Sequence, residues 1–164
     1  MLFRQFHLPP QFPGALFASH MPGSGEPFEE FELAVKGYDI SRVICLAERD
    51  EIRNLSPGYS QALEQGHNPP VTEIPAPNYG LPYDRHAFFT AVQEVVELLR
   101  GGERVLIHCA AGIGRTGMFA TCVLMALGIP LERAHKIVSE AGSGAQSEEQ
   151  ECFIEDFMFE LLLP

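Results

Sequence analysis

Apolar positions follow two patterns that alternate along the chain. Short apolar runs rich in β-branched residues predict buried strands, and apolar residues repeated every three or four positions predict amphipathic helices. We expect strands at Gly14–Ser19, Arg42–Leu46, Val71–Ile74 and Arg104–His108. We expect helices at Glu26–Val35, Leu55–Gln65, Asp84–Arg100, Arg115–Leu127, Pro130–Ala141 and Ser147–Leu163. This alternation predicts a single α/β domain, with a mostly parallel central sheet of about four to five strands flanked by helices on both faces.

Some of these elements carry more specific expectations. The helix at Asp84–Arg100 has the clearest periodic face, which consists of Phe88, Ala91, Val92, Val95 and Leu99. In the helix at Glu26–Val35, the residues expected to face inward are Phe28, Phe31 and Leu33. We expect loops at the charged stretch Glu48–Glu51 and at the proline-rich stretch Pro75–Pro82.

The composition is that of one globular domain with an acidic balance. Of the 164 residues, 46% are hydrophobic, so we expect one domain over residues 1–164 with its core at about residues 14–157. Acidic residues outnumber basic ones by 22 to 11, which gives a net charge of −11. Such a chain does not attract nucleic acid, and an anionic membrane surface should repel it. No apolar stretch approaches the ~18 residues that a membrane span requires.

The cysteines and the first residues bear on the cellular compartment. The four cysteines lie far apart without a C-x-x-C pair, which argues against a disulfide scaffold or a zinc site. Residues 1–14 lack the continuous apolar region of a signal peptide. We therefore expect a cytoplasmic monomer with free thiols, no metal and no cofactor.

The segment from Val105 to Gly117 carries the most specific chemistry. A buried strand leads into a glycine-spaced turn and then into a hydrophobic helix, so that consecutive backbone N–H groups surround one point at the helix N-terminus. Because such a point binds anions, we call this loop the phosphate cradle. Its phosphate contacts are assigned to Cys109, Ala110, Ala111, Gly112, Ile113, Gly114 and Arg115.

Three side chains of the cradle predict a reaction. The sulfur of Cys109 can lie at the bottom of the loop, where N–H groups that bind an anion also favour a thiolate. Arg115 can contact two phosphoryl oxygens at once, and Thr116 is placed to donate a hydrogen bond to the sulfur. The arrangement permits in-line attack of the thiolate on phosphorus, followed by hydrolysis of the phosphocysteine, without a metal.

The pattern His108-Cys109-x-x-Gly112-x-x-Arg115-Thr116 resembles the signature of the cysteine-dependent protein tyrosine phosphatase superfamily. The length is similar to that of its compact dual-specificity branch. The stretch Gly142-Ser-Gly-Ala-Gln146 and Gln150 resembles the glutamine-bearing segment of the cyclin-dependent-kinase-associated phosphatase. The resemblance covers roughly residues 14–157, and it implies hydrolysis of phosphotyrosine, and of phosphoserine or phosphothreonine, in proteins or small phosphomonoesters.

The resemblance leaves the general acid open. Family members supply the leaving-group proton from an aspartate in the loop before the long amphipathic helix, and that position falls on Asn78, which cannot act as an acid. Asp84 is the favoured substitute, although it is also a natural N-cap of the helix. The alternatives are a loop without an acid, a carboxylate elsewhere such as Asp50 or Glu51, or His86.

Two glutamines are the candidates for positioning the hydrolytic water, again by the resemblance. Gln146 and Gln150 would share one helix face if the last helix extends back to them. The competing interpretation is local, because Ser147 and Gln150 fit a capping box. Relatives carry an arginine just before the glycines, where this chain has Ala141, so we expect a secondary anion contact to be missing.

The cradle also bears on the substrate. Its variable positions are not basic, which favours a singly phosphorylated group, and Tyr79 or Tyr83 could stack on a phenyl ring. Two other classes of function remain open. One is a phosphate-binding module without efficient turnover because of Asn78, and the other is sulfur-transfer or arsenate chemistry. The intact Cys109 and Arg115 weigh against the first, and Thr116 weighs against the second.

Overall fold

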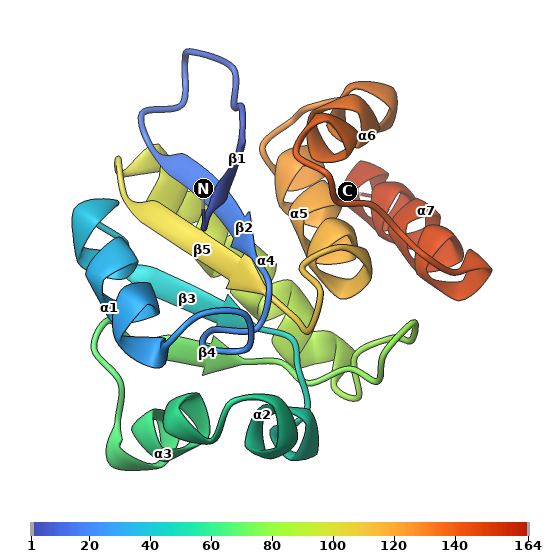
Figure 1. Ribbon diagram of the computed structural model, residues 1–164. Coiled ribbons are helices and arrows are strands. Elements are labelled where there is room, and N and C mark those ends of the chain that lie inside the picture. The colour runs from blue at the N-terminus through green and yellow to red at the C-terminus, as the bar shows by residue number, and fades with distance from the viewer. Residues whose placement is uncertain (1, 164) are drawn as a thin grey trace.

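The computed structural model describes residues 2–163 and contains one five-stranded sheet with helices around it (Figure 1). The strands are β1 (Arg4–Phe6), β2 (Ala15–Ser19), β3 (Arg42–Cys45), β4 (Val71–Glu73) and β5 (Arg104–His108). The helices are α1 (Phe28–Gly37), α2 (Arg49–Leu55), α3 (Pro57–Gln65), α4 (Arg85–Arg100), α5 (Gly114–Ala126), α6 (Leu131–Glu140) and α7 (Glu148–Leu162). The strand order is β1-β2-β5-β3-β4, and only the β1–β2 pair is antiparallel. The predicted fold class is confirmed.

Alternate positions on the central strands face two different cores, as the pleat of a sheet requires. Leu16, Ile44 and Ile107 belong to the larger core, which includes residues of α4, α5, α6 and α7. Phe17 and Leu106 face the other way, into a smaller core with α1. Figure 1 shows α1 on one side of the sheet and α5, α6 and α7 on the other. Strand β5 is therefore covered on both faces.

Most predicted elements are confirmed, but two were missed. Strand β1 is only three residues long, too short to show a periodic pattern, and it pairs with β2 at the sheet edge. The expected loop at Glu48–Glu51 is wrong, because the chain forms α2 from Arg49. This helix buries only Ile52 and begins with a capping box between Glu48 and Glu51, so its apolar pattern is weak.

Helix α1 begins later than expected, and its buried face differs. Leu33 was expected to face inward, but its side chain is 68% exposed. The inward positions are Phe31 and Val35, which are one helical turn apart, while Phe28 is partly buried. By contrast, the predicted apolar face of α4 is confirmed in full. None of the helices in the described part of the chain is long and apolar enough to cross a bilayer.

Candidate active site

The phosphate cradle lies where β5 ends at His108 and α5 begins at Gly114, at the carboxyl edge of the parallel strands. Among residues 2–163, the backbone N–H groups from Ala110 to Thr116 donate no hydrogen bond to another main-chain oxygen. The four N–H groups of a first helical turn lack partners in every α-helix, and here the loop adds further ones. The local sequence thus concentrates unpaired donors around one point.

Gly112 is required by the backbone at the turn of the cradle. It has φ +76°, in the left-handed region that favours glycine, and a Cβ there would collide with the carbonyl oxygen of Ser19. The neighbouring strand therefore approaches the cradle closely. Just beyond β2, the Met21 N–H donates to the carbonyl oxygen of Ala110, at 2.9 Å.

Cys109 lies at the bottom of this loop with only 2% of its surface exposed. The hydroxyl of Thr116 donates to its sulfur, with Oγ1 3.1 Å from Sγ, as the sequence predicted. The other thiols have different surroundings. Burial raises the pKa of Cys45 to about 12 and also raises the pKa of Cys122, so both stay protonated in their cores. Buried protonated thiols react slowly.

Arg115 is 1% exposed, and its guanidinium has two different edges. Nη1 and Nη2 each lie 2.8 Å from a carboxylate oxygen of Glu51, and Nη1 also donates to the carbonyl oxygen of Ala76. Its Nε is buried and has no hydrogen-bond partner among the described residues. An unpartnered buried donor on a charged group costs free energy, and an anion bound in the cradle would relieve that cost.

Glu51 is the main residue that the sequence interpretation placed in the wrong role. It was a minor candidate for the general acid, but it forms a bidentate ion pair with Arg115. Burial alone would raise the pKa of its carboxyl group, yet the hydrogen bonds from Arg115 and from the Glu48 backbone lower it. A carboxylate held in its ionised form orients the guanidinium and is poorly suited to donate a proton.

His108 supports the cradle from below. Its Nδ1 lies 3.1 Å from the carbonyl oxygen of Cys109, which can only accept, so Nδ1 carries the proton. The neutral ring then accepts at Nε2 from the hydroxyl of Tyr59, at 2.7 Å. Burial lowers the pKa of His108 to about 4, so the neutral tautomer persists at physiological pH. Tyr59 showed no signal in the sequence beyond its place in a weak helix.

The Pro75–Pro82 loop is anchored at two points, one on the cradle and one on α7. Ala76 accepts from Arg115, and Gly80 accepts from the side chain of Gln150, at 3.1 Å. Between these anchors, Asn78 and Tyr79 are exposed, and Tyr79 has φ +62°. A tyrosine in the left-handed region is strained, so the turn holds its ring outward at some energetic cost.

The structure places Asp84 at the start of α4. Its Oδ1 accepts from the Ala87 N–H at 3.0 Å, so the expected N-cap is confirmed. The side chain is exposed, and its role as the general acid stays a prediction. Asp50 is also exposed and pairs with Arg53 on α2. His86 is exposed in the first turn of α4.

Gln146 and Gln150 do not share a helix face, because α7 begins only at Glu148. Gln150 is fully buried and uses both ends of its amide, since it accepts from the Gln146 N–H at 2.8 Å and donates to Gly80. Its backbone N–H donates to Ser147, which confirms half of the expected cap. Gln150 thus holds the Pro75–Pro82 loop. Gln146 is exposed, and its side chain lies beside Gly114 of the cradle, so water positioning by Gln146 stays a prediction.

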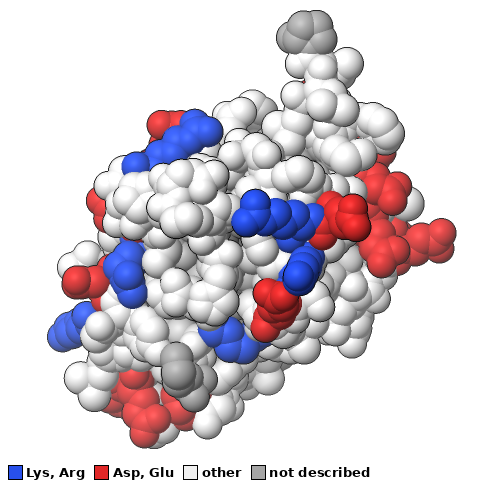
Figure 2. All heavy atoms as spheres, turned by 90° about the horizontal axis from the view of Figure 1, so that it is seen from above, with Lys and Arg blue, Asp and Glu red and all other residues white. Residues whose placement is uncertain are grey.

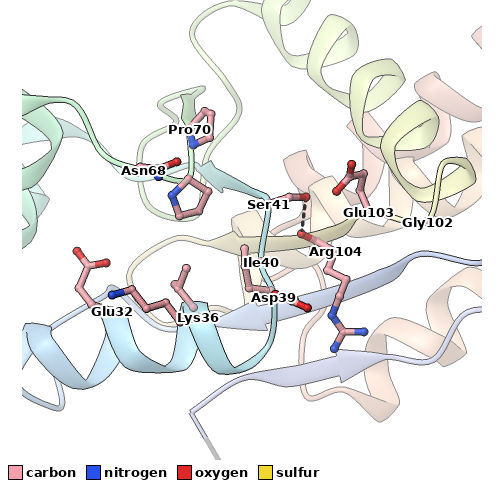
Figure 3. A pocket seen from close by; sticks show the side chains of 12 residues that line it. Glu32, Lys36, Asp39, Ile40, Ser41, Asn68, Pro70, Gly102, Glu103 and Arg104 are labelled. Carbon is pink, nitrogen blue, oxygen red and sulfur yellow. Dashed lines mark hydrogen bonds between the residues drawn. The ribbon is translucent and has the colours of Figure 1, made fainter.

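A separate cavity lies at the amino ends of the parallel strands. It has a volume of about 650 Å³, and its lining includes Lys36, Asp39, Glu103 and Arg104 (Figure 3). It shares no residue with the cradle. Figure 2 shows acidic side chains gathered on the side where α7 lies, and basic ones scattered singly. The first turn of α7 carries Glu148, Glu149 and Glu151.

Comparisons with known proteins agree with this geometry. The model of one protein family, described as "PTP-SAK: Swiss Army Knife protein, DSP-PTPase phosphatase domain", matches residues 12–152. Kinase associated phosphatase, with its catalytic cysteine substituted by serine, superposes with a TM-score of 0.77. The two chains are 20% identical, over 92% of this chain and 89% of that one.

Two further solved structures share the fold. PTPMT1 in complex with PI(5)P has a TM-score of 0.76 at 15% identity, over 99% of this chain and 97% of that one. The human tyrosine phosphatase-like serine/threonine/tyrosine-interacting protein has a TM-score of 0.71 at 17% identity, over 98% of each chain. At these identities the likeness shows a shared fold.

Proposed function

Because the chain belongs to the PTP-SAK family of DSP-PTPase phosphatase domains, we propose that it hydrolyses phosphomonoesters through a phosphocysteine intermediate. Its substrates are phosphotyrosine in proteins and, more slowly, phosphoserine and phosphothreonine. The observation that carries the proposal is the unpartnered, buried Nε of Arg115 beside a loop of unpaired N–H groups, with the sulfur of Cys109 in the same loop.

The reaction needs this chain and water. The Cys109 thiolate attacks phosphorus, an S–P bond forms, and the P–O bond to the leaving group breaks while that oxygen takes up a proton, from Asp84 if that residue is the acid and from solvent if the loop has none. Water then attacks the phosphocysteine and gives its proton back to the same group, the S–P bond breaks, and inorganic phosphate and the thiolate are released. The cradle N–H groups and Arg115 bind the equatorial oxygens in both steps, and Thr116 stabilises the sulfur when it becomes the leaving group.

Three features support the substrate class. Ala110, Ala111 and Ile113 add no positive charge to the cradle, which suits a singly phosphorylated group. Tyr79 is held outward on a loop that is tied to the cradle arginine, where its ring can contact a phenyl group. A phenolate leaves with less protonation than an alkoxide, so Asn78 favours phosphotyrosine. The free thiols of the described residues suit a reducing, cytoplasmic compartment.

The direct test is release of inorganic phosphate from phosphotyrosine and phosphoserine peptides of the same sequence. We expect faster release from the phosphotyrosine peptide. Cys109→Ser should abolish release of phosphate from either peptide. Cys152→Ser, a change at an exposed thiol, should leave the rate of release unchanged. Retention of turnover by Cys109→Ser would exclude the covalent mechanism.

A second experiment separates the candidate acids. If Asp84 is the acid, Asp84→Asn should slow an unactivated aryl phosphate by about 10²–10⁴-fold and hardly affect one with an activated leaving group. If the loop has no acid, Asp84→Asn should leave the rates on both esters near those of wild type, and stability should hardly change because asparagine caps a helix about as well as aspartate. Asn78→Asp should then raise activity on phosphotyrosine. We favour Asp84, and a flat response to Asp84→Asn would contradict this choice.

The alternative function is phosphate binding without efficient turnover, for which Asn78 is the specific observation. The presence of both Cys109 and Arg115 weighs against it, because a binding module does not need the nucleophile. The phosphotyrosine assay distinguishes the two, because a binding module would bind inorganic phosphate through the same cradle and release none from the peptide.

A further inference from the structure

A positive charge from the first strand reaches the back of the cradle. Arg4 lies on β1, and its Nη2 donates to the carbonyl oxygen of Gly112 at 2.7 Å. Its Nη1 donates to the carbonyl oxygen of Ala141 at 2.5 Å and lies 3.3 Å from the hydroxyl of Ser143. Arg4 therefore joins the cradle to the segment between α6 and α7. The family match begins at residue 12, so Arg4 lies outside it.

The carbonyl of Gly112 receives two hydrogen bonds. Besides Arg4, the hydroxyl of Ser143 donates to it at 2.7 Å, and Ser143 is 6% exposed. This oxygen belongs to the same peptide unit as the N–H of Ile113. In a planar trans peptide the two groups point in opposite directions. Fixing the oxygen toward Arg4 and Ser143 therefore fixes the Ile113 N–H toward the other side, where the cradle binds its anion.

We propose that Arg4 is a positioning residue of the phosphate cradle, which orients the Gly112–Ile113 peptide so that the Ile113 N–H faces the bound phosphoryl group. The inference rests on the proposed function, since it concerns the same anion site. Arg4 contacts neither the substrate nor Cys109, and it acts through the backbone. Arg4 also binds the carbonyl oxygen of Ala141, the position where this chain lacks the arginine of its relatives, but it does not provide the secondary anion contact that we expected to be missing.

The surroundings of Arg4 fit this role. A Cβ at Gly142 would come within 2.9 Å of Nη1, and Gly142 has φ +81°, so the segment is shaped to admit the guanidinium. Burial lowers the pKa of Arg4, while the charge of Cys109 acts in the opposite direction.

The test measures anion affinity separately from turnover. Inorganic phosphate is titrated into Cys109→Ser protein by calorimetry, and its inhibition constant is measured against an aryl phosphate with the active enzyme. Losing one preorganised N–H donor typically costs about 10²–10³-fold. Because Ser143 still holds the carbonyl, we expect Arg4→Gln to weaken phosphate binding and lower kcat/KM by only about 10-fold, a part of that loss.

The double variant sharpens the test. Ser143→Ala alone should have a small effect, because Arg4 remains, but Arg4→Gln with Ser143→Ala frees the peptide. We expect the double variant to lose about 10²-fold or more in phosphate affinity, beyond the product of the two single effects. The phosphate affinity of Arg4→Lys should lie between those of wild type and Arg4→Gln. A lysine ammonium can donate to the carbonyl oxygen of Gly112, but it has no second nitrogen that donates to Ala141.

Gln5→Ala is the matched control, because Gln5 is the exposed neighbour on the same strand. It should leave phosphate affinity unchanged. If the Arg4 variants lose stability in urea but bind phosphate as tightly as wild type, Arg4 is a structural strut and the inference is overturned. If the wild-type protein neither binds phosphate nor hydrolyses the ester, the proposed function fails first, so the two failures are distinguishable.

Discussion

The two ends of the parallel sheet differ in how their polar groups are satisfied. At the carboxyl end, the cradle contains a run of unpaired N–H groups and a buried guanidinium with one free donor. At the amino end, the cavity of about 650 Å³ is lined by charges that face solvent or already have partners. Arg104, for instance, donates to the Tyr38 carbonyl oxygen and lies over the ring of Phe17.

This difference teaches that the site is defined by unsatisfied donors and not by volume. A cavity of about 650 Å³ with satisfied walls gains little from a ligand, because each new hydrogen bond replaces one that water already makes. The buried Nε of Arg115 has no protein partner among the described residues, so an anion bound in the cradle would be its first charged partner. The following predictions break or sharpen this contrast.

The largest effect is expected from Arg115→Lys. An ammonium keeps the charge, but it cannot make two parallel hydrogen bonds to Glu51 and, at the same time, two to a phosphoryl group. We expect kcat/KM to fall by about 10³-fold, in line with the loss of a preorganised donor. Arg133→Lys, an exposed change on α6, is the control. Activity near that of wild type would show that Arg115 does not hold the phosphoryl oxygens.

A smaller loss is expected from Glu51→Gln. A glutamine amide has one acceptor oxygen, so it can accept from only one of Nη1 and Nη2 of Arg115. The guanidinium is then less firmly oriented, and its Nε points less accurately toward the cradle. Misplacement of a positioned group by about 1 Å can cost about 10²-fold, and we expect kcat/KM to fall by up to this amount. Asp50→Asn, one residue earlier and exposed, should change it little. Equal rates for both variants would refute the orienting role of Glu51.

The buried His108 predicts a pH dependence of stability. Its folded-state pKa is about 4, below the ordinary value of 6.5, so between these values the unfolded chain binds a proton that the folded protein does not. This contribution is therefore fully present above about pH 6.5 and is lost as the pH falls toward 4, by about 3 kcal/mol in total.

Urea unfolding at pH 7.5 and pH 5 checks this point, because most carboxylates remain ionised at both. About 2 kcal/mol should be lost by pH 5. His108→Gln should flatten the change, and His135→Gln, at an exposed position on α6, should not. The lowered pKa of Glu51 adds in the same direction at lower pH, since its stabilisation requires the ionised carboxylate and is lost as the pH falls through that pKa.

The smallest effect is expected at the amino end of the sheet. Lys36→Gln and Glu103→Gln change exposed charges that line the large cavity, and surface changes of this kind usually alter stability by less than about 0.5 kcal/mol. We expect kcat/KM to stay within about twofold of wild type. A tenfold loss would mean that the two ends of the sheet are coupled, and the contrast drawn above would fail.

The part of the site that could be predicted from the sequence is the part that is local. Cys109, Arg115 and Thr116 lie within one strand–turn–helix unit, so their spacing determines their geometry. Glu51 and Arg4 reach the cradle across long separations in sequence, 64 and 108 positions, which no spacing rule reveals.

The same distinction applies to the fold. Long helices such as α4 bury a full periodic face and were predicted correctly. Two short elements, α2 and β1, were missed, because α2 is stabilised in part by the ion pair between Glu51 and Arg115, and β1 by pairing with β2. Their stability comes from partners that are distant in the chain, so the local pattern is weak.

The contacts of Arg4 have a consequence for the order in which the protein is made. During synthesis, Arg4 leaves the ribosome well before its partners Ala141 and Ser143, which follow 137 and 139 positions later. A nascent chain synthesised only through α5 already contains Cys109 and Arg115. It still lacks Ala141 and Ser143, which contact Arg4 and the Gly112 carbonyl behind the cradle. The complete cradle can therefore form only after the segment between α6 and α7 has been synthesised and has met β1.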